Sequence, residues 1–243
     1  MKKIFHLVVV SAVSAGALLQ AAETGIVIAR ADRTASVKRG DVVAAGSTIN
    51  VAGGTVRGSA FPGANFALSG KDASLKVDGV TINAQGGFIT QQSAALTLAS
   101  GDLISTVSRT DGVVTNYSVT VAQGTASAEL TQNQGSASGI DATKDNVVAA
   151  SYKGVLYFTF NHGVPLPNKP DGTKEGEPKV IVAISEGMAL VYDLFKTGGE
   201  LVPISALSSI GGPQAIIDAL GEFSAGEIVP PPDVPPGTIS PSW

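Results

Sequence analysis

Between Ala94 and Gly124 the chain alternates apolar with polar residues in short runs, and glycine, aspartate and asparagine interrupt these runs. A period of two is typical of a β-strand with one buried face, and turn residues spaced roughly 8–12 positions apart favour many short strands. The same pattern extends from residue 24 to about 140 and returns in shorter runs up to Leu194. We therefore expect an all-β fold, either an irregular β-solenoid or a β-sandwich of short strands.

The residues after the last expected strand follow a different pattern. Ile216, Ile217 and Leu220 form one apolar stripe at helical spacing, so we expect a short helix over residues 214–220 that stops at Gly221. Six prolines between residues 230 and 243 predict an extended terminal segment. The predicted parts of the chain are a signal peptide at 1–22, a β domain at 23–200, a short helical segment at 201–229 and a proline-rich tail at 230–243.

The first 22 residues have the layout of a secretory signal peptide. Lys2 and Lys3 form a positive start, an apolar stretch runs over residues 4–19, and two alanines precede Glu23. An uncleaved membrane anchor is the alternative, because about 20 apolar residues can span a bilayer. We expect cleavage, which would give an exported protein in the periplasm, at the cell surface or outside the cell, with no membrane insertion.

Composition excludes several classes of protein and of site. The chain contains no cysteine, which excludes disulfides, thiol nucleophiles, zinc–thiolate sites and a lipoprotein-type signal. Charged residues make up only 15% of the chain, and 20 acidic residues outnumber 16 basic ones. Nucleic-acid binding requires clustered lysine and arginine, which this chain lacks, so we expect no nucleic-acid partner.

Several segments resemble the FecR domain family of bacterial envelope proteins. The run Gly40-Asp41-Val42, followed by Gly46-Ser47-Thr48-Ile49, is similar to the opening of that family. Residues 62–68 and 73–77 are similar to the strands that come next in the family. The segments similar to its later strands are 96–104, 117–124 and 180–191.

The resemblance implies an envelope protein with an all-β domain. It covers roughly residues 25–200, and it departs from the family at residues 124–127, which lack the arginine that members usually carry there. Family members joined to a transmembrane helix and a cytoplasmic anti-sigma segment relay envelope signals to a sigma factor. Only three residues precede the apolar stretch of this chain, so we expect a free-standing exported domain that binds a partner or acts as a scaffold.

A polar loop between two expected strands is the candidate binding site. Residues 161–178 are rich in proline, glycine and charge, and they contain His162, the only histidine outside the signal peptide. A general base acts together with the other groups of its site, and a lone histidine in a mobile polar loop has no evident second group, so we expect no catalytic residue here. The candidate binding residues of the loop are Asn161, His162, Lys169, Asp171, Lys174 and Glu175.

The remaining motifs are interpreted as structural. Arg39-Gly40-Asp41 has the sequence of an integrin-binding tripeptide, but glycine followed by aspartate is also typical of a β-turn, and we favour the turn. The chain contains no phosphate-binding loop, no nucleophile elbow and no EF-hand spacing. We therefore expect no cofactor, no metal site and no enzymatic activity.

Three functions follow from these observations, in decreasing order of preference. The first is a non-catalytic exported module, FecR-like, that binds a protein or glycan of the bacterial envelope. The second is a structural surface protein that self-associates into a homo-oligomer, because uncharged strand edges pair readily with other strands. The third is a glycan-active enzyme, which would need two converging carboxylates.

Overall fold

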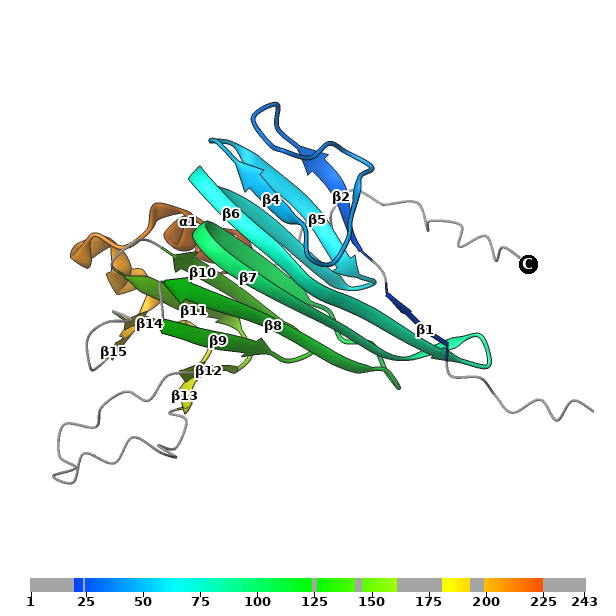
Figure 1. Cartoon of the computed structure of the whole chain (residues 1–243). Helices are drawn as coiled ribbons and strands as arrows, with labels where there is room; N and C mark the ends of the chain where they lie inside the picture. Colours follow the sequence, from blue (N-terminus) through cyan, green and yellow to red (C-terminus); the bar gives the residue numbers. More distant parts are fainter. Residues whose placement is uncertain are drawn as a thin grey trace, which may run out of the picture.

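The computed structural model describes residues 20–23, 25–123, 126–142, 146–160, 181–192 and 199–224. Within these residues the chain forms fifteen strands of one hydrogen-bonded sheet, a 3-10 helix and an α-helix (Figure 1). The all-β prediction and the C-terminal helix are confirmed. The strands are β1 Gln20–Glu23, β2 Ile26–Ala31, β3 Val42–Val43, β4 Thr48–Val51, β5 Thr55–Phe61, β6 Ala64–Gln85, β7 Phe88–Val107, β8 Val114–Gln123, β9 Ala126–Gln132, β10 Ser136–Ala142, β11 Val147–Lys153, β12 Leu156–Phe160, β13 Ile181–Ile184, β14 Met188–Tyr192 and β15 Gly199–Pro203; the helices are η1 Ile204–Ile210 and α1 Gln214–Ser224.

Two long strands, β6 and β7, organise the sheet. They pair antiparallel along their whole lengths. The register shifts between the pairs Ser69↔Asp102 and Ser74↔Ser100, so β6 carries additional residues at this point. The sequence predicts a turn at residues 69–72 with a separate short strand on each side. The structure instead has one continuous strand, because the extra residues form an irregularity within the pairing with β7.

The β6–β7 hairpin bends at this irregularity. Gly70 and Gly101 lie at the bend with φ values of 137° and 95°, which residues with a side chain rarely adopt. The backbones are also close, since a Cβ on Gly101 would lie 2.4 Å from the Cβ of Ala73. The bend places the two halves of β7 in different layers. Ser105 in the second half therefore donates a 2.9 Å hydrogen bond to the side chain of Gln132, which belongs to the layer of the first half.

Strand β7 changes its partner at the bend. Residues Gln91–Leu98 pair parallel with β8, whereas residues Gly101–Val107 pair antiparallel with β10. Two branches continue from these partners, β8–β9–β12–β13 and β10–β11–β14–β15. The branches pack face to face, and the rings of Phe160 on β12 and Tyr192 on β14 have centroids 4.2 Å apart. This arrangement of two layers corresponds to the sandwich alternative rather than the solenoid.

One hydrophobic core fills the space between the layers, and a second lies under the helices. Phe158 is fully buried in the first core. In the second core, Ile216 of α1 packs against the outer face of β10 and β11, and the hydroxyl of Tyr152 donates a 2.9 Å hydrogen bond to the Ile216 carbonyl. The predicted helix stop at Gly221 is wrong. The helix continues to Ser224, because Gly221 does not take the left-handed conformation that ends many helices.

Candidate functional site

The predicted binding loop falls outside the described residues. Asn161, His162, Lys169, Asp171, Lys174 and Glu175 are all in the segment between β12 and β13 for which the structure gives no description. Their role as binding residues stays a prediction. The described residues provide a different candidate site, and it lies in the N-terminal part of the sheet.

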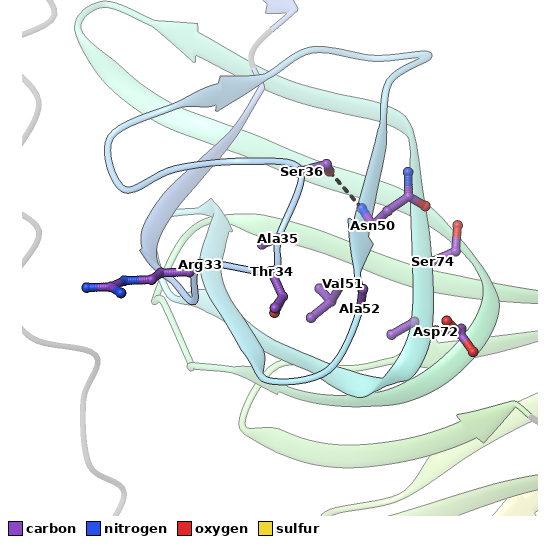
Figure 2. Close-up of a pocket in the computed structure, with 10 residues that line it drawn as sticks. Arg33, Thr34, Ala35, Ser36, Asn50, Val51, Ala52, Asp72 and Ser74 are labelled. Atoms are coloured by element: carbon purple, nitrogen blue, oxygen red, sulfur yellow. Dashed lines mark hydrogen bonds between the residues drawn. The ribbon is translucent and has the colours of Figure 1, made fainter.

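A polar groove lies beside β4 and is the candidate binding site (Figure 2). It has a volume of about 390 Å³ and is lined by three segments, Arg33–Ser36, Asn50–Ala52 and Asp72–Ser74. Val51 and Ala73 are buried, whereas most of the polar residues that line the groove are exposed to solvent. The groove therefore combines an apolar surface, which includes Val51 and Ala73, with polar side chains along its walls.

Backbone pairing fixes the walls of the groove. Ala35 forms an isolated antiparallel bridge with Val51, and the amide of Ser36 donates a 2.9 Å hydrogen bond to the carbonyl of Asn50. The hydroxyl of Ser36 accepts a 2.9 Å hydrogen bond from the Asn50 amide, as the dashed line in Figure 2 shows. The hydroxyl of Thr34 donates a further bond to the carbonyl of Gly53. These contacts hold the groove in a preformed shape, which lowers the ordering cost of binding.

The polar side chains of the groove can recognise a ligand through hydrogen bonds. These polar side chains are the hydroxyls of three residues, the amide of Asn50 and the carboxylate of Asp72, whereas the side chain of Arg33 points away from the other lining residues (Figure 2). The groove contains no histidine, and none of its serines has a base as a hydrogen-bond partner, so it lacks the nucleophile–base pair of covalent catalysis. Such a surface suits a polar ligand with both donors and acceptors. The three residues that supply hydroxyls are Thr34, Ser36 and Ser74.

The turn at Arg39-Gly40-Asp41 directly precedes β3 and has a structural role. Gly40 has a φ of 89°, and the carboxylate of Asp41 accepts a 2.8 Å hydrogen bond from the amide of Lys38. This aspartate therefore closes its own turn, as the sequence predicts. The amide of Gly40 also donates to the carbonyl of Ile28, which ties the turn to β2.

A buried polar cluster lies between the two layers. The side-chain oxygen of Gln132 accepts 2.9 Å hydrogen bonds from the hydroxyls of Ser105 and Ser138, and its nitrogen donates to the carbonyl of Ser136. Gln132, Ser105 and Ser138 are each at most 1% exposed. Because the polar groups satisfy one another and solvent does not reach them, this cluster stabilises the packing of the layers rather than binding a ligand.

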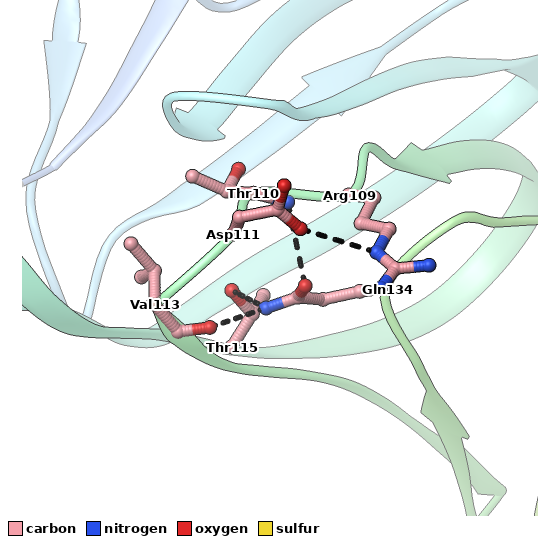
Figure 3. Close-up of polar contacts among 6 residues, drawn as sticks. All are labelled: Arg109, Thr110, Asp111, Val113, Thr115 and Gln134. Carbon is pink, nitrogen blue, oxygen red and sulfur yellow. Dashed lines mark hydrogen bonds and ion pairs between the residues drawn. The ribbon is translucent and has the colours of Figure 1, made fainter.

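A second set of polar contacts shapes the loop between β7 and β8 (Figure 3). The side-chain nitrogen of Gln134 donates to the carbonyl of Val113 at 2.5 Å and to the hydroxyl of Thr115 at 2.8 Å. Arg109 and Asp111 form a 3.3 Å ion pair at the surface, where both side chains are more than 80% exposed. The pair is therefore weak. These contacts hold the predicted turn at Asp111-Gly112 in place.

Two aspartates meet on β7 and β10, at the side of the sheet that the helices cover. Asp102 and Asp141 are register partners, and their carboxyl groups are hydrogen-bonded to each other. Burial raises the pKa of both groups, and burial together with the charge of Asp102 raises the pKa of Asp141 to about 7. The pair therefore binds a proton more tightly than an exposed aspartate does.

The aspartate pair does not have the arrangement of a glycan hydrolase. The two carboxyl groups of such enzymes are about 5–10 Å apart, so that a sugar ring and water fit between them. Asp102 and Asp141 contact each other directly, and Oδ1 of Asp102 is buried without a hydrogen-bond partner. The sequence predicts both aspartates as turn residues far apart in the chain, and only the pairing of β7 with β10 brings them together.

In the described part of the chain, no group of three or more histidine, cysteine, aspartate or glutamate side chains could hold a metal ion. None of the helices found there has the length and apolar character needed to cross a membrane.

Comparison with known proteins assigns no family to the chain. No family model and no curated protein matches it. Two crystal structures, each described as a "putative anti-sigma factor" from Parabacteroides distasonis ATCC 8503, are similar to it at 10% identity. The first has a TM-score of 0.40 and covers 65% of this chain and 59% of its own; the second has a TM-score of 0.36 and covers 75% and 72%. The chain thus spans less than two thirds of the first of these structures.

The fold and the groove together define the class of the molecule. It is an all-β protein with two packed layers, a helical cover on one face and an open polar groove beside β4. The TM-scores of the two solved structures are too low to carry their description over to this chain.

Proposed function

We propose that this protein is a non-catalytic, FecR-like module of the bacterial envelope, exported by its N-terminal segment, which binds a protein or glycan partner through the polar groove. The observation that carries the proposal is the groove itself. It is preformed by backbone pairing, it is open to solvent, and it presents both hydrogen-bond donors and acceptors beside an apolar surface. Binding sites commonly combine these features.

The resemblance to FecR domains supports the assignment of the binding site to this region. Two of the three groove segments lie next to or within the similar segments, since Asn50 directly follows the run at 46–49 and Ala73 and Ser74 lie within residues 73–77. The part of the chain that resembles an envelope domain thus also supplies the walls of the groove. An envelope protein or an envelope glycan offers the polar groups that such walls bind.

The groove variants Asn50→Ala and Asp72→Ala test this proposal. Each removes a polar group from one wall, and we expect each to weaken binding about tenfold, which corresponds to about 1.4 kcal/mol. Binding is measured with the purified chain on two probes, an array of bacterial envelope glycans and a detergent extract of envelope proteins. The matched control is Arg57→Ala, which removes an exposed arginine of β5 that does not line the groove.

The glycan array and the protein extract separate the two kinds of partner. Binding to one probe that both groove variants weaken and that Arg57→Ala leaves intact would support the proposal and identify the class of partner. Binding that both groove variants retain at full strength would refute the assignment of the groove. The proposal would also be refuted if neither probe bound to the unaltered chain.

A further inference from the structure

We infer that the edge of β6 at Thr81–Ala84 is a self-association site, where a second copy of the processed chain pairs its own Thr81–Ala84 strand antiparallel to the first. This inference rests on one part of the proposed function, the removal of the N-terminal segment during export. It concerns a surface separate from the polar groove.

Most of the β6 edge is covered by other parts of the chain. Strand β5 pairs with residues 64–69 and β4 pairs with residues 73–76. The amide of Val77 then donates a 2.9 Å hydrogen bond to Ser47, and the Val77 carbonyl accepts one of 2.7 Å from Gly46. Beyond this point, β1 is the one described strand on this edge, and Figure 1 shows it beside the far end of the β6–β7 hairpin.

The covering strand β1 straddles the predicted cleavage site. Gln20–Glu23 pairs antiparallel with Thr81–Ala84, in the register Gln20↔Ala84 to Glu23↔Thr81. Cleavage after Ala22 removes three of its four residues. In the processed chain, the edge of β6 at Thr81–Ala84 is therefore unpaired. The same edge pairs antiparallel with β1 in the full chain, and an unpaired edge of this kind readily pairs with another chain.

The lack of charge on this edge favours a second copy as the occupant. Residues 79–101 contain no aspartate, glutamate, lysine, arginine or proline. In an interface with two-fold symmetry, each residue near the symmetry axis lies opposite the same residue of the second copy. Charged residues on this edge would therefore place like charges opposite each other and weaken the interface. Natural strand edges that must stay unpaired usually carry lysine or proline, and this edge has neither.

Asn83 gives the register of the paired copies. Its side-chain nitrogen donates a 3.2 Å hydrogen bond to Gln91, while its side-chain oxygen is buried without a hydrogen-bond partner. With the two-fold axis at this residue, each Asn83 oxygen accepts a hydrogen bond from the second amide hydrogen of the other copy. Ile82 then lies opposite Ala84 of the second copy.

The predicted dimer is weak and extends toward the hairpin tip. Phe88 is the register partner of Gln85 and is 78% exposed, so it supplies apolar surface next to the paired edges. A contact of two short strands with one aromatic residue on each side is smaller than a standard protein interface. We expect a dissociation constant on the order of 10–100 μM.

Cysteine scanning tests the site and its register. The natural chain has no cysteine, so a single introduced thiol reports on one position. The processed chain is prepared with one cysteine at position 81, 82, 83 or 84, oxidised with copper–phenanthroline, and analysed by non-reducing electrophoresis. We expect most disulfide-linked dimer from Asn83→Cys, because residues opposite each other across antiparallel strands are close enough for a disulfide. The control is Ala183→Cys, on the exposed face of β13.

Equal cross-linking of Asn83→Cys and Ala183→Cys, or none at any of the four β6 positions, would overturn the inference. A second measurement keeps the test independent of cysteine chemistry. Sedimentation velocity of Asn83→Lys should show monomer at 100 μM where the unaltered processed chain shows dimer, while Ala183→Lys still dimerises. Far-UV circular dichroism verifies that both lysine variants are folded.

Failure of this inference can be told apart from failure of the proposed function. If the processed chain binds its probe through the groove but stays monomeric at 100 μM, only the self-association site is refuted. If the chain isolated from the envelope still carries residues 1–22, export processing is refuted, and the β6 edge is expected to remain covered.

Discussion

Replacing Gly101 by alanine is expected to lower the free energy of unfolding by about 2–6 kcal/mol. Two effects add at this position. A residue with a side chain is strained by about 1–3 kcal/mol at the φ of 95° found here. In addition, the new methyl group would lie 2.4 Å from the Cβ of Ala73 and 2.7 Å from the carbonyl of Ser69, and forced contacts in a packed interior cost about 1–3 kcal/mol.

Urea unfolding, followed by circular dichroism, measures the effect of Gly101→Ala. Gly79→Ala is the matched control, because Gly79 is also in β6–β7 but has open space at its Cβ position and no positive φ. We expect the control to change stability by less than about 1 kcal/mol. If Gly101→Ala were as stable as the control, the claim that the two-layer fold requires glycine at the bend would be contradicted.

The aspartate pair is expected to make the protein less stable as the pH rises from about 4 to 8. The pKa of Asp141 is about 7 in the folded chain and 3.8 in the free group, so the folded state retains a proton that the unfolded state loses. The stabilisation by this proton is complete below about pH 4 and is lost as the pH rises through 7. After discounting for solvent screening, we expect a loss of roughly 1–2 kcal/mol.

Asp141→Asn tests this pH dependence. The amide keeps a hydrogen bond to Asp102 but cannot ionise, so the variant should be more stable than the natural protein at pH 8 and should lose less stability between pH 5 and pH 8. Urea midpoints at intervals of one pH unit measure the slope. Asp111→Asn is the control, because its side chain is 93% exposed and it lies outside the pair. Equal slopes for Asp141→Asn and the control would refute the raised pKa of the pair.

The sequence predicts the class of fold because burial alternates along each strand. Ala94, Leu96 and Leu98 are all buried, as the period of two requires. The bend was not predictable in the same way. Ser69-Gly70-Lys71-Asp72 has the composition of a turn, and whether such residues start a new strand or interrupt an existing one depends on the partner strand, which lies some 30 residues away in the sequence.

The candidate site was less accessible to sequence analysis than the fold. The groove combines three segments that are separated by 13 or more residues, and none of them carries a motif. Asp102 and Asp141 each resemble an ordinary turn aspartate, and their contact follows from the register of β7 with β10. A short, local pattern could reveal Asp41 as a turn residue because its hydrogen bond spans only three positions.

The measurement that tests the central claim most directly is the intact mass of the chain recovered from a bacterial host that expresses the full sequence. The account of an exported envelope module predicts a periplasmic or extracellular protein that begins at Glu23, with 14 basic and 20 acidic residues. Cleavage would leave the groove unchanged and expose the β6 edge. Recovery of the uncleaved 243-residue chain from the cytoplasm, and of none from the envelope, would contradict the account.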